Sequence, residues 1–86
     1  MIRRLVAFDT TSSKSNLTLI DAVRGYLAAH GVDSRLIPDE SGAKANLFAT
    51  IGPAVEGGVA LAGHTDVVPV EGQPWTSPPC TLAERD

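Results

Sequence analysis

The pattern of apolar and polar residues predicts helices at the start of the chain and strands after them. Ile2, Leu5 and Val6 recur at helical spacing, so the first eight residues are expected to be the end of a helix. The polar residues 9–16 that follow form a predicted loop, and several of them are types that cap helices. The chain is therefore expected to begin with a helix, a polar loop and a second helix.

The second helix is predicted from about Leu17 to His30. Ser15 or Asn16 can accept a backbone N–H bond at its start, and Gly31 suits the left-handed residue that ends a helix. The apolar residues recur every three or four positions, as on the buried face of an amphipathic helix. They are Leu19, Ile20, Val23, Tyr26 and Leu27.

Short strands are predicted after this helix. The half-polar range 32–38 ends in a proline, which marks a strand end or an edge, and the range 45–51 alternates between apolar and polar residues. Residues 59–62 are continuously apolar, which is typical of a strand covered on both faces. The range 68–79 is rich in proline and is expected to be an ordered loop. The predicted fold class is α/β, with two helices and then a mixed sheet of about three strands.

Composition and charge exclude several classes of protein. The 86 residues are 43% hydrophobic and 20% charged, which is typical of a globular chain. Seven basic against ten acidic residues give a net charge of −3, so the basic surface of a nucleic-acid binder is missing. No apolar run approaches the ~20 residues of a membrane span or the core of a signal peptide. A single cysteine, Cys80, forms no internal disulfide, which favours a cytoplasmic setting.

One pair of residues carries candidate chemistry. His64 and Asp66 follow the predicted strand 59–62, and residues two apart in extended backbone project to the same side, here toward one cavity. A neutral histidine can give one ring nitrogen to zinc while a carboxylate accepts the N–H of the other. The alternative interpretation is that the Thr-Asp pair caps a turn and that the histidine is structural.

The residues around this pair resemble the first metal-ligand motif of the dinuclear-zinc aminoacylase, deacylase and carboxypeptidase metallopeptidase family. The motif is Gly63-His64-Thr65-Asp66-Val67-Val68-Pro69, followed by Gly72, Trp75 and Pro79. Within the family, four stretches look most like a deacetylase. In chain order they are R-R-L-V-A-F-D-T-T-S-S-K-S-N-L, L-I-D-A-V-R-G-Y-L-A-A-H-G-V, V-P-V-E-G-Q-P-W-T-S-P-P and T-L-A-E-R-D. The resemblance covers essentially the whole chain.

The resemblance implies a fold, a cofactor and a role for each residue of the pair. His64 would ligate one zinc ion, and Asp66 would be the catalytic-site carboxylate behind it. A complete active site would hold two Zn²⁺ ions, for which Co²⁺ can substitute. Residues 1–86 would form the N-terminal segment of a zinc-exopeptidase-like α/β/α catalytic domain, cut before the remaining ligands, the general base and an inserted dimerisation domain. The complete protein is then expected to be a homodimer that hydrolyses an N-acyl amino acid, whereas this segment alone is expected to be inactive.

Two other functions are compatible with the sequence. Another member of the family, such as a desuccinylase or an amino-acid carboxypeptidase, would carry the same motif. A small non-enzymatic binding domain would use the range 63–66 only as a capped turn. A downstream acidic pair and a distant histidine would favour the enzyme.

The other residues with reactive or aromatic side chains are interpreted as structural. Cys80 stands where the family usually has an aromatic residue, and we interpret it as a small apolar side chain rather than a zinc ligand. Trp75 either anchors its loop on the core or lines the mouth of the site. His30 is placed to interact with the helix dipole. The range 9–11 is expected to cap and turn, and the range 39–40 to lie in a solvated turn.

Overall fold

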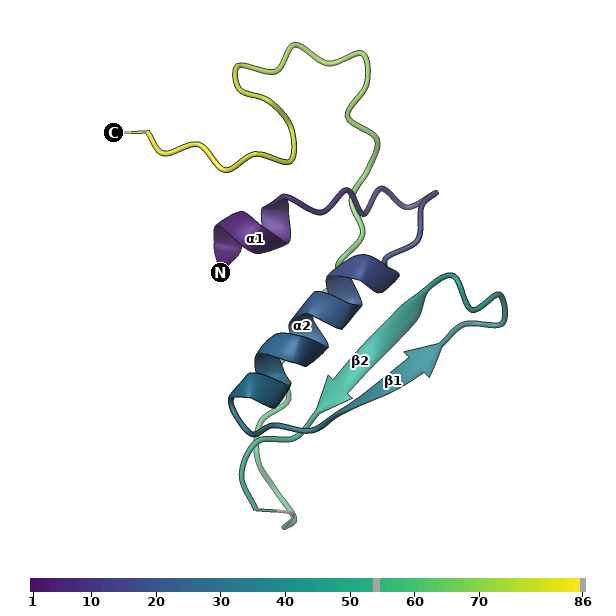
Figure 1. Ribbon diagram of the computed structural model, residues 1–86, viewed down its shortest axis with the longest axis vertical. Coiled ribbons are helices and arrows are strands. Elements are labelled where there is room, and N and C mark those ends of the chain that lie inside the picture. The colour runs from purple at the N-terminus through teal and green to yellow at the C-terminus, as the bar shows by residue number, and fades with distance from the viewer. Residues whose placement is uncertain (54, 86) are drawn as a thin grey trace.

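The structure is a computed structural model that describes residues 1–53 and 55–85. Two helices precede an antiparallel pair of strands, as Figure 1 shows. The elements are α1 (Ile2–Val6), α2 (Leu17–Ala29), β1 (Ser34–Pro38) and β2 (Ala45–Ala49). Both helices and both of these strands lie where the sequence predicts them, and the α/β class is confirmed. Within the described residues, no helix has the length and apolar character to cross a membrane.

The ends of α2 follow from the residues predicted to cap it. The Ser15 hydroxyl oxygen accepts the backbone N–H of Leu17 at 3.1 Å. At the other end, Nδ1 of His30 lies 2.9 Å from the carbonyl oxygen of Tyr26 and donates to it. Gly31 then takes a φ of +75°, the left-handed conformation that ends many helices. His30 is therefore a capping residue at the negative end of the helix dipole.

A tight turn joins β1 to β2 and is held by one carboxylate. Oδ1 of Asp39 accepts the hydroxyl of Ser41 at 2.8 Å and the backbone N–H of Gly42 at 2.9 Å. The hydrogen bond from Ser41 is the main reason that the pKa of Asp39 lies below its usual value. Gly42 has a φ of +73°, which suits glycine. The predicted turn is confirmed, and its acidic residue has a structural role.

A small apolar core lies between α2 and the two strands. The buried apolar residues are Leu19 and Ile20 of α2 and Ala45 of β2, and Leu19 also lines a hollow shared with the proline-rich loop. More buried and more exposed positions alternate along β2, as the sequence predicts, and Phe48 points away from the core. The radius of gyration is 15.4 Å, against about 12 Å expected for a compact domain of this length. The chain is therefore more extended than a compact domain, and few apolar side chains of the described residues are buried.

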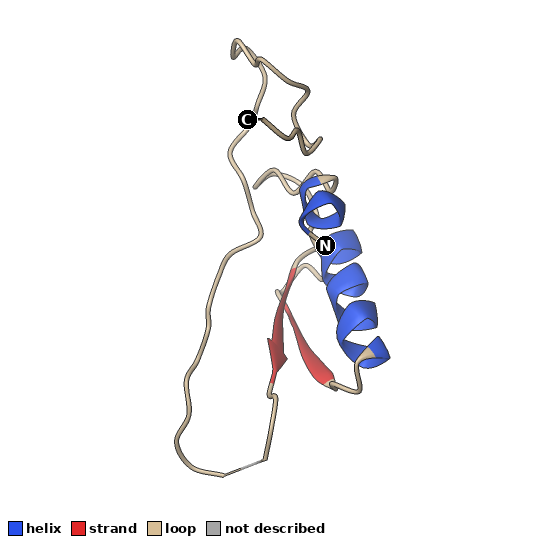
Figure 2. Cartoon of the chain, turned by 90° about the vertical axis from the view of Figure 1, so that its left-hand side faces the viewer, coloured by secondary structure: helices blue, strands red, loops and turns tan. Residues whose placement is uncertain are grey.

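The third strand predicted over residues 59–62 is not formed. These residues belong to a long loop that runs apart from β1 and β2 (Figure 2), and Val59 and Leu61 are 90% and 95% exposed. The sheet is two-stranded and antiparallel rather than mixed. The physical reason is that a continuous apolar run becomes a stable strand only when neighbours cover it. Among the described elements, α2 is packed on the strand pair and none is placed over this segment.

Candidate functional site

A short parallel pairing holds the segment with the candidate site beside the loop that precedes α2. The pairing aligns Thr11 with Val67. The N–H of Val67 donates to the Thr10 carbonyl at 3.1 Å, and the N–H of Ser12 donates to the Val67 carbonyl at 2.9 Å. The Thr10 hydroxyl also donates to the Thr65 carbonyl, and both threonines of the loop are buried. Two segments more than fifty residues apart are thereby joined at the site.

The start of this loop is organised by Asp9. Its Oδ1 accepts the backbone N–H and the hydroxyl of Thr11 at 3.2 and 2.6 Å, and its Oδ2 forms an ion pair with Lys14. The hydrogen bond from Lys14, followed by those from Thr11, lowers the pKa of Asp9 to about 2. The prediction that these residues cap and turn the chain is confirmed for Asp9 and Thr11. Thr10 instead holds the site segment.

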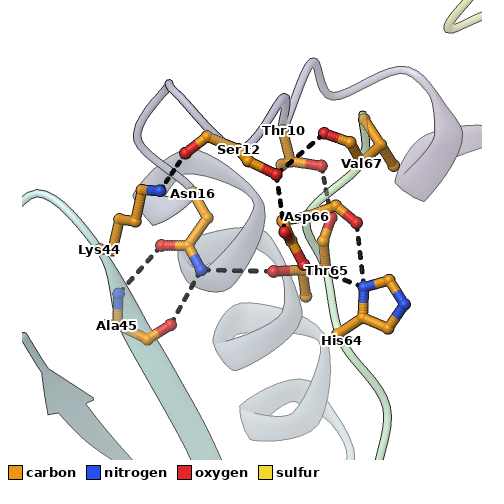
Figure 3. A network of polar contacts seen from close by, with 9 residues as sticks. All are labelled: Thr10, Ser12, Asn16, Lys44, Ala45, His64, Thr65, Asp66 and Val67. Atoms are coloured by element: carbon orange, nitrogen blue, oxygen red, sulfur yellow. Dashed lines mark hydrogen bonds and ion pairs between the residues drawn. The ribbon is translucent and has the colours of Figure 1, made fainter. Parts of the chain in front are cut away.

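The His64 ring is in direct contact with Asp66 (Figure 3). Nδ1 of the imidazole lies 3.0 Å from the carboxylate Oδ1 and 3.0 Å from the backbone carbonyl oxygen of the same residue. Both oxygens can only accept, so Nδ1 carries the proton. When the ring is neutral, the lone pair on Nε2 is then free for another partner. The side chain is 86% exposed, which leaves that nitrogen accessible.

The second carboxylate oxygen of Asp66 is also engaged. Ser12 donates its hydroxyl to Oδ2 at 2.7 Å. The pKa of Asp66 lies below the usual value for an aspartate. The hydrogen bond from Ser12 is the largest cause, and the hydrogen bond from His64 is the second. The carboxylate therefore stays ionised at neutral pH, and both of its oxygens act as acceptors.

Asn16 joins the site segment to the strand pair. Its Nδ2 donates to the Ala45 carbonyl at 2.9 Å and to the Thr65 hydroxyl at 3.3 Å, while its Oδ1 accepts the Ala45 N–H at 3.0 Å. Lys44, at the end of the turn, donates from Nζ to the Ser12 carbonyl. The loop before α2, the strand pair and the site segment thus form one polar network, drawn in Figure 3.

His64 and Asp66 border different hollows, although the sequence predicts that they face one cavity. His64 lines a hollow of about 620 Å³ between the helices and the proline-rich loop, where its neighbours include Val68, Trp75 and Cys80. Asp66 lies in a second hollow of about 390 Å³ beside the strand pair. The segment lies outside the two-stranded sheet and is paired only at Val67, with the loop before α2. Ser12 holds the carboxylate toward the loop instead.

Trp75 lines the mouth of the first hollow and is half exposed. Its Nε1 donates to the Val70 carbonyl at 2.9 Å, so the indole braces its own loop rather than the core. Trp75 thus takes the second of its two predicted placements, at the site, and the predicted anchoring of its loop on the core is wrong. Cys80 is a free thiol in the same hollow.

Curated relatives match the chain over all or most of its length. The acetylornithine deacetylase of Pasteurella multocida (strain Pm70) is 42% identical over 93 residues, which cover 100% of this chain and 24% of that protein. The enzymes of the same name from Photorhabdus laumondii and Proteus mirabilis are 41% and 38% identical, each over 81 residues that cover 93% of this chain and 21% of theirs. Over all or most of its length, the chain is therefore similar to part of the acetylornithine deacetylases. The chain spans between about a fifth and a quarter of the length of these relatives.

These relatives confirm the predicted resemblance of the chain to a deacetylase. No family model matches the chain, and no solved structure matches it either. The names of the relatives state an activity but no metal, so the zinc role of His64 stays a prediction.

The donor atoms at the site fit one part of a zinc centre. Nε2 of His64 is accessible, and the carboxylate behind Nδ1 is the partner that zinc-bound histidines commonly have. Residues 1–53 and 55–85 contain no group of three His, Cys, Asp or Glu side chains that could hold a metal ion. The arrangement therefore fits a single ligand with its supporting carboxylate, and a catalytic zinc needs about three protein ligands.

Three polar residues of this network were not singled out as site residues from the sequence. Ser12, Asn16 and Lys44 lie in polar stretches that suggest caps and turns, and Asn16 is also at the N-cap of α2. The one available signal is the run of short hydroxyl side chains at 10–13, which exceeds what a single helix cap needs. That run does not say which distant segment its hydroxyls bind.

Proposed function

We propose that the protein is a zinc-dependent amidohydrolase that cleaves N-acetyl-L-ornithine to acetate and L-ornithine. The reaction would serve arginine biosynthesis in the cytoplasm, and the complete protein would act as a homodimer. Two findings support the proposal: the curated relatives are named for this activity, and His64 is paired with a carboxylate as a zinc ligand would be. The remaining ligands and the general base would come from residues other than those of this chain.

The observation that carries the proposal is the 3.0 Å contact between His64 Nδ1 and Asp66 Oδ1. It fixes the tautomer in which Nε2 is the free donor atom, and the carboxylate holds the ring in one orientation. When bound, zinc would polarise the amide carbonyl and lower the pKa of a bound water toward 7. The part of His64 is to hold the metal, and that of Asp66 is to orient the ring.

The proposal is tested with two variants of the full-length protein. His64→Ala removes a ligand, so zinc content should fall and hydrolysis of N-acetyl-L-ornithine should collapse. Asp66→Asn keeps the size of the side chain but removes its charge, and a loss of about 10–100-fold in zinc affinity or kcat is expected. His30→Ala and Asp33→Asn are matched controls, because both side chains are exposed and lie outside the site network.

Metal content, kcat and circular dichroism are measured for each variant. If Asp66→Asn stays folded with wild-type zinc content and activity, the carboxylate is only a turn cap and the proposed role is wrong. Substrate choice is tested separately by comparing N-acetyl-L-ornithine with N-succinyl-L,L-diaminopimelate. Preferential hydrolysis of the succinyl compound would show that the protein is a different deacylase of the same type.

A further inference from the structure

We propose that Ser12 is a positioning residue of this site, whose hydroxyl fixes the Asp66 carboxylate and, through it, the ring of His64. The inference rests on the proposed function, because it assigns a part of the metal centre to the loop before α2. That loop is far from the metal-ligand motif in the sequence and contains none of the residues that the resemblance assigns to the centre.

The two oxygens of the Asp66 carboxylate are held from opposite sides. Oδ1 accepts from His64 at 3.0 Å, and Oδ2 accepts from the Ser12 hydroxyl at 2.7 Å. The terminal torsion of an aspartate side chain is broad, so a carboxylate held by one oxygen can turn about its own axis. A second hydrogen bond on the other oxygen fixes the plane of the group. Ser12 therefore limits the directions from which the imidazole N–H can be accepted.

Two hydrogen bonds fix the backbone of Ser12, one at its N–H and one at its carbonyl oxygen. Its N–H donates to the Val67 carbonyl at 2.9 Å, and its own carbonyl accepts from Lys44 Nζ. The hydroxyl oxygen lies 2.7 Å from the charged carboxylate and 3.2 Å from the Val67 carbonyl. A hydroxyl has one hydrogen to donate, and the shorter contact with a charged acceptor is the stronger of the two. The hydroxyl is thus directed at Asp66 by a fixed backbone.

The neighbouring hydroxyls of the loop have other partners. That of Thr10 donates to the Thr65 carbonyl, and that of Thr11 donates to Asp9. Ser13 is exposed and is the adjacent residue of the same type. Ser13→Ala is therefore a control matched in residue type, loop and exposure to Ser12→Ala.

Without the Ser12 hydroxyl, Oδ2 of Asp66 should lose its hydrogen bond from the protein and bind water instead. The proton of the neutral His64 ring should then be found less often on Nδ1, and Nε2 should be available less often as a ligand. Loss of one solvent-accessible hydrogen bond corresponds to roughly a threefold to tenfold change in an equilibrium constant. We expect zinc to bind Ser12→Ala weaker by about that factor. Ser12→Thr keeps a hydroxyl at the same position and should restore the wild-type behaviour.

The experiment compares wild type, Ser12→Ala, Ser12→Thr and Ser13→Ala as full-length proteins. In the metal-free state at about pH 8, where an ordinary imidazole is neutral, long-range ¹H–¹⁵N spectra report which ring nitrogen carries the proton. The His64 signals are assigned by their absence in His64→Ala. Zinc dissociation constants are measured by competition with a chelator. We expect the ring signals and the zinc affinity to change in Ser12→Ala, and to stay at their wild-type values in Ser12→Thr and Ser13→Ala.

Two results would overturn the proposal: unchanged His64 signals and zinc affinity in Ser12→Ala, or an equal change in Ser13→Ala. Failure of Ser12→Thr to restore either quantity would also count against a role for the hydroxyl. The ring signals need neither zinc nor substrate. If the full-length protein does not hydrolyse N-acetyl-L-ornithine but Ser12→Ala shifts them, the proposed reaction fails while the positioning role stands. If the full-length protein hydrolyses the substrate and Ser12→Ala changes neither the His64 signals nor the zinc affinity, only the positioning role fails.

Discussion

Replacement of Asn16 by alanine should lower the free energy of unfolding by about 1–3 kcal/mol. The side chain makes two hydrogen bonds of normal length to the backbone of Ala45, at 2.9 and 3.0 Å. Each such bond contributes a net ~0.5–1.5 kcal/mol, and the pair gives the range stated. The third bond, to the Thr65 hydroxyl at 3.3 Å, is longer and is replaceable by water.

The reason for expecting the upper part of this range is the position of Ala45 in the strand pair. The Lys44 carbonyl accepts the N–H of Asp39 across the strands, so the polar groups of the next residue point to the outer edge of β2. Ala45 is only 4% exposed, and its N–H and carbonyl would lose their partner where water has limited access. Asn16 therefore supplies the donor and acceptor that a neighbouring strand would offer.

Urea unfolding followed by circular dichroism measures the effect. Asn46→Ala is the matched control, because it removes the same side chain from an exposed position of β2 and should stay within about 0.5 kcal/mol of wild type. Asn16→Asp keeps the acceptor for the Ala45 N–H but loses the donor, so an intermediate loss is expected. If Asn16→Ala and Asn46→Ala are equally stable, the two bonds contribute nothing and the reasoning is refuted.

Two further predictions concern the loop before α2 and the end of that helix. The pKa of Asp9 is lowered from 3.8 to about 2, so its contribution to stability is present above about pH 4 and is lost as the pH falls toward 2. Asp9→Asn should therefore make the free energy of unfolding, measured with urea, depend less on pH between about 4 and 2. Gly31→Ala should destabilise the protein by about 1 kcal/mol, because φ there is +75°. Gly25→Ala is the control: Gly25 lies within α2, where alanine is favoured over glycine, so the protein should become more stable by about 0.5–1 kcal/mol. Neither added methyl group meets an atom within 4 Å, so the two variants differ in backbone conformation and not in steric contact. Equal shifts in Tm for both variants would contradict this reasoning.

Local patterns in the sequence were sufficient to predict α2 and the strand pair. The helix combines a regular apolar stripe with capping residues at both ends, and these signals lie within a few residues of what they determine. The turn at Asp39 is equally local, because its carboxylate binds residues two and three positions away. Such elements depend little on the rest of the chain.

The candidate site was predictable only in its local part. His64 and Asp66 are two residues apart, so their contact follows from the backbone and the chemistry of the pair. The bond from Ser12 to Asp66 spans 54 residues, and that from Asn16 to Thr65 spans 49. Serine and asparagine before a helix satisfy the rules for a cap, and this local interpretation conceals a tertiary role.

The failure of the predicted strand at 59–62 has a consequence for how the site is held. An apolar run indicates that a segment can be buried, but burial also depends on neighbours that the run itself does not specify. Val59 and Leu61 are almost fully exposed, so the residues before His64 give it little support. The ring is instead held from the residues that follow it, where Thr65 and Val67 are bound to the loop before α2. The geometry of the site therefore depends on that polar loop more than on the apolar segment that leads into the motif.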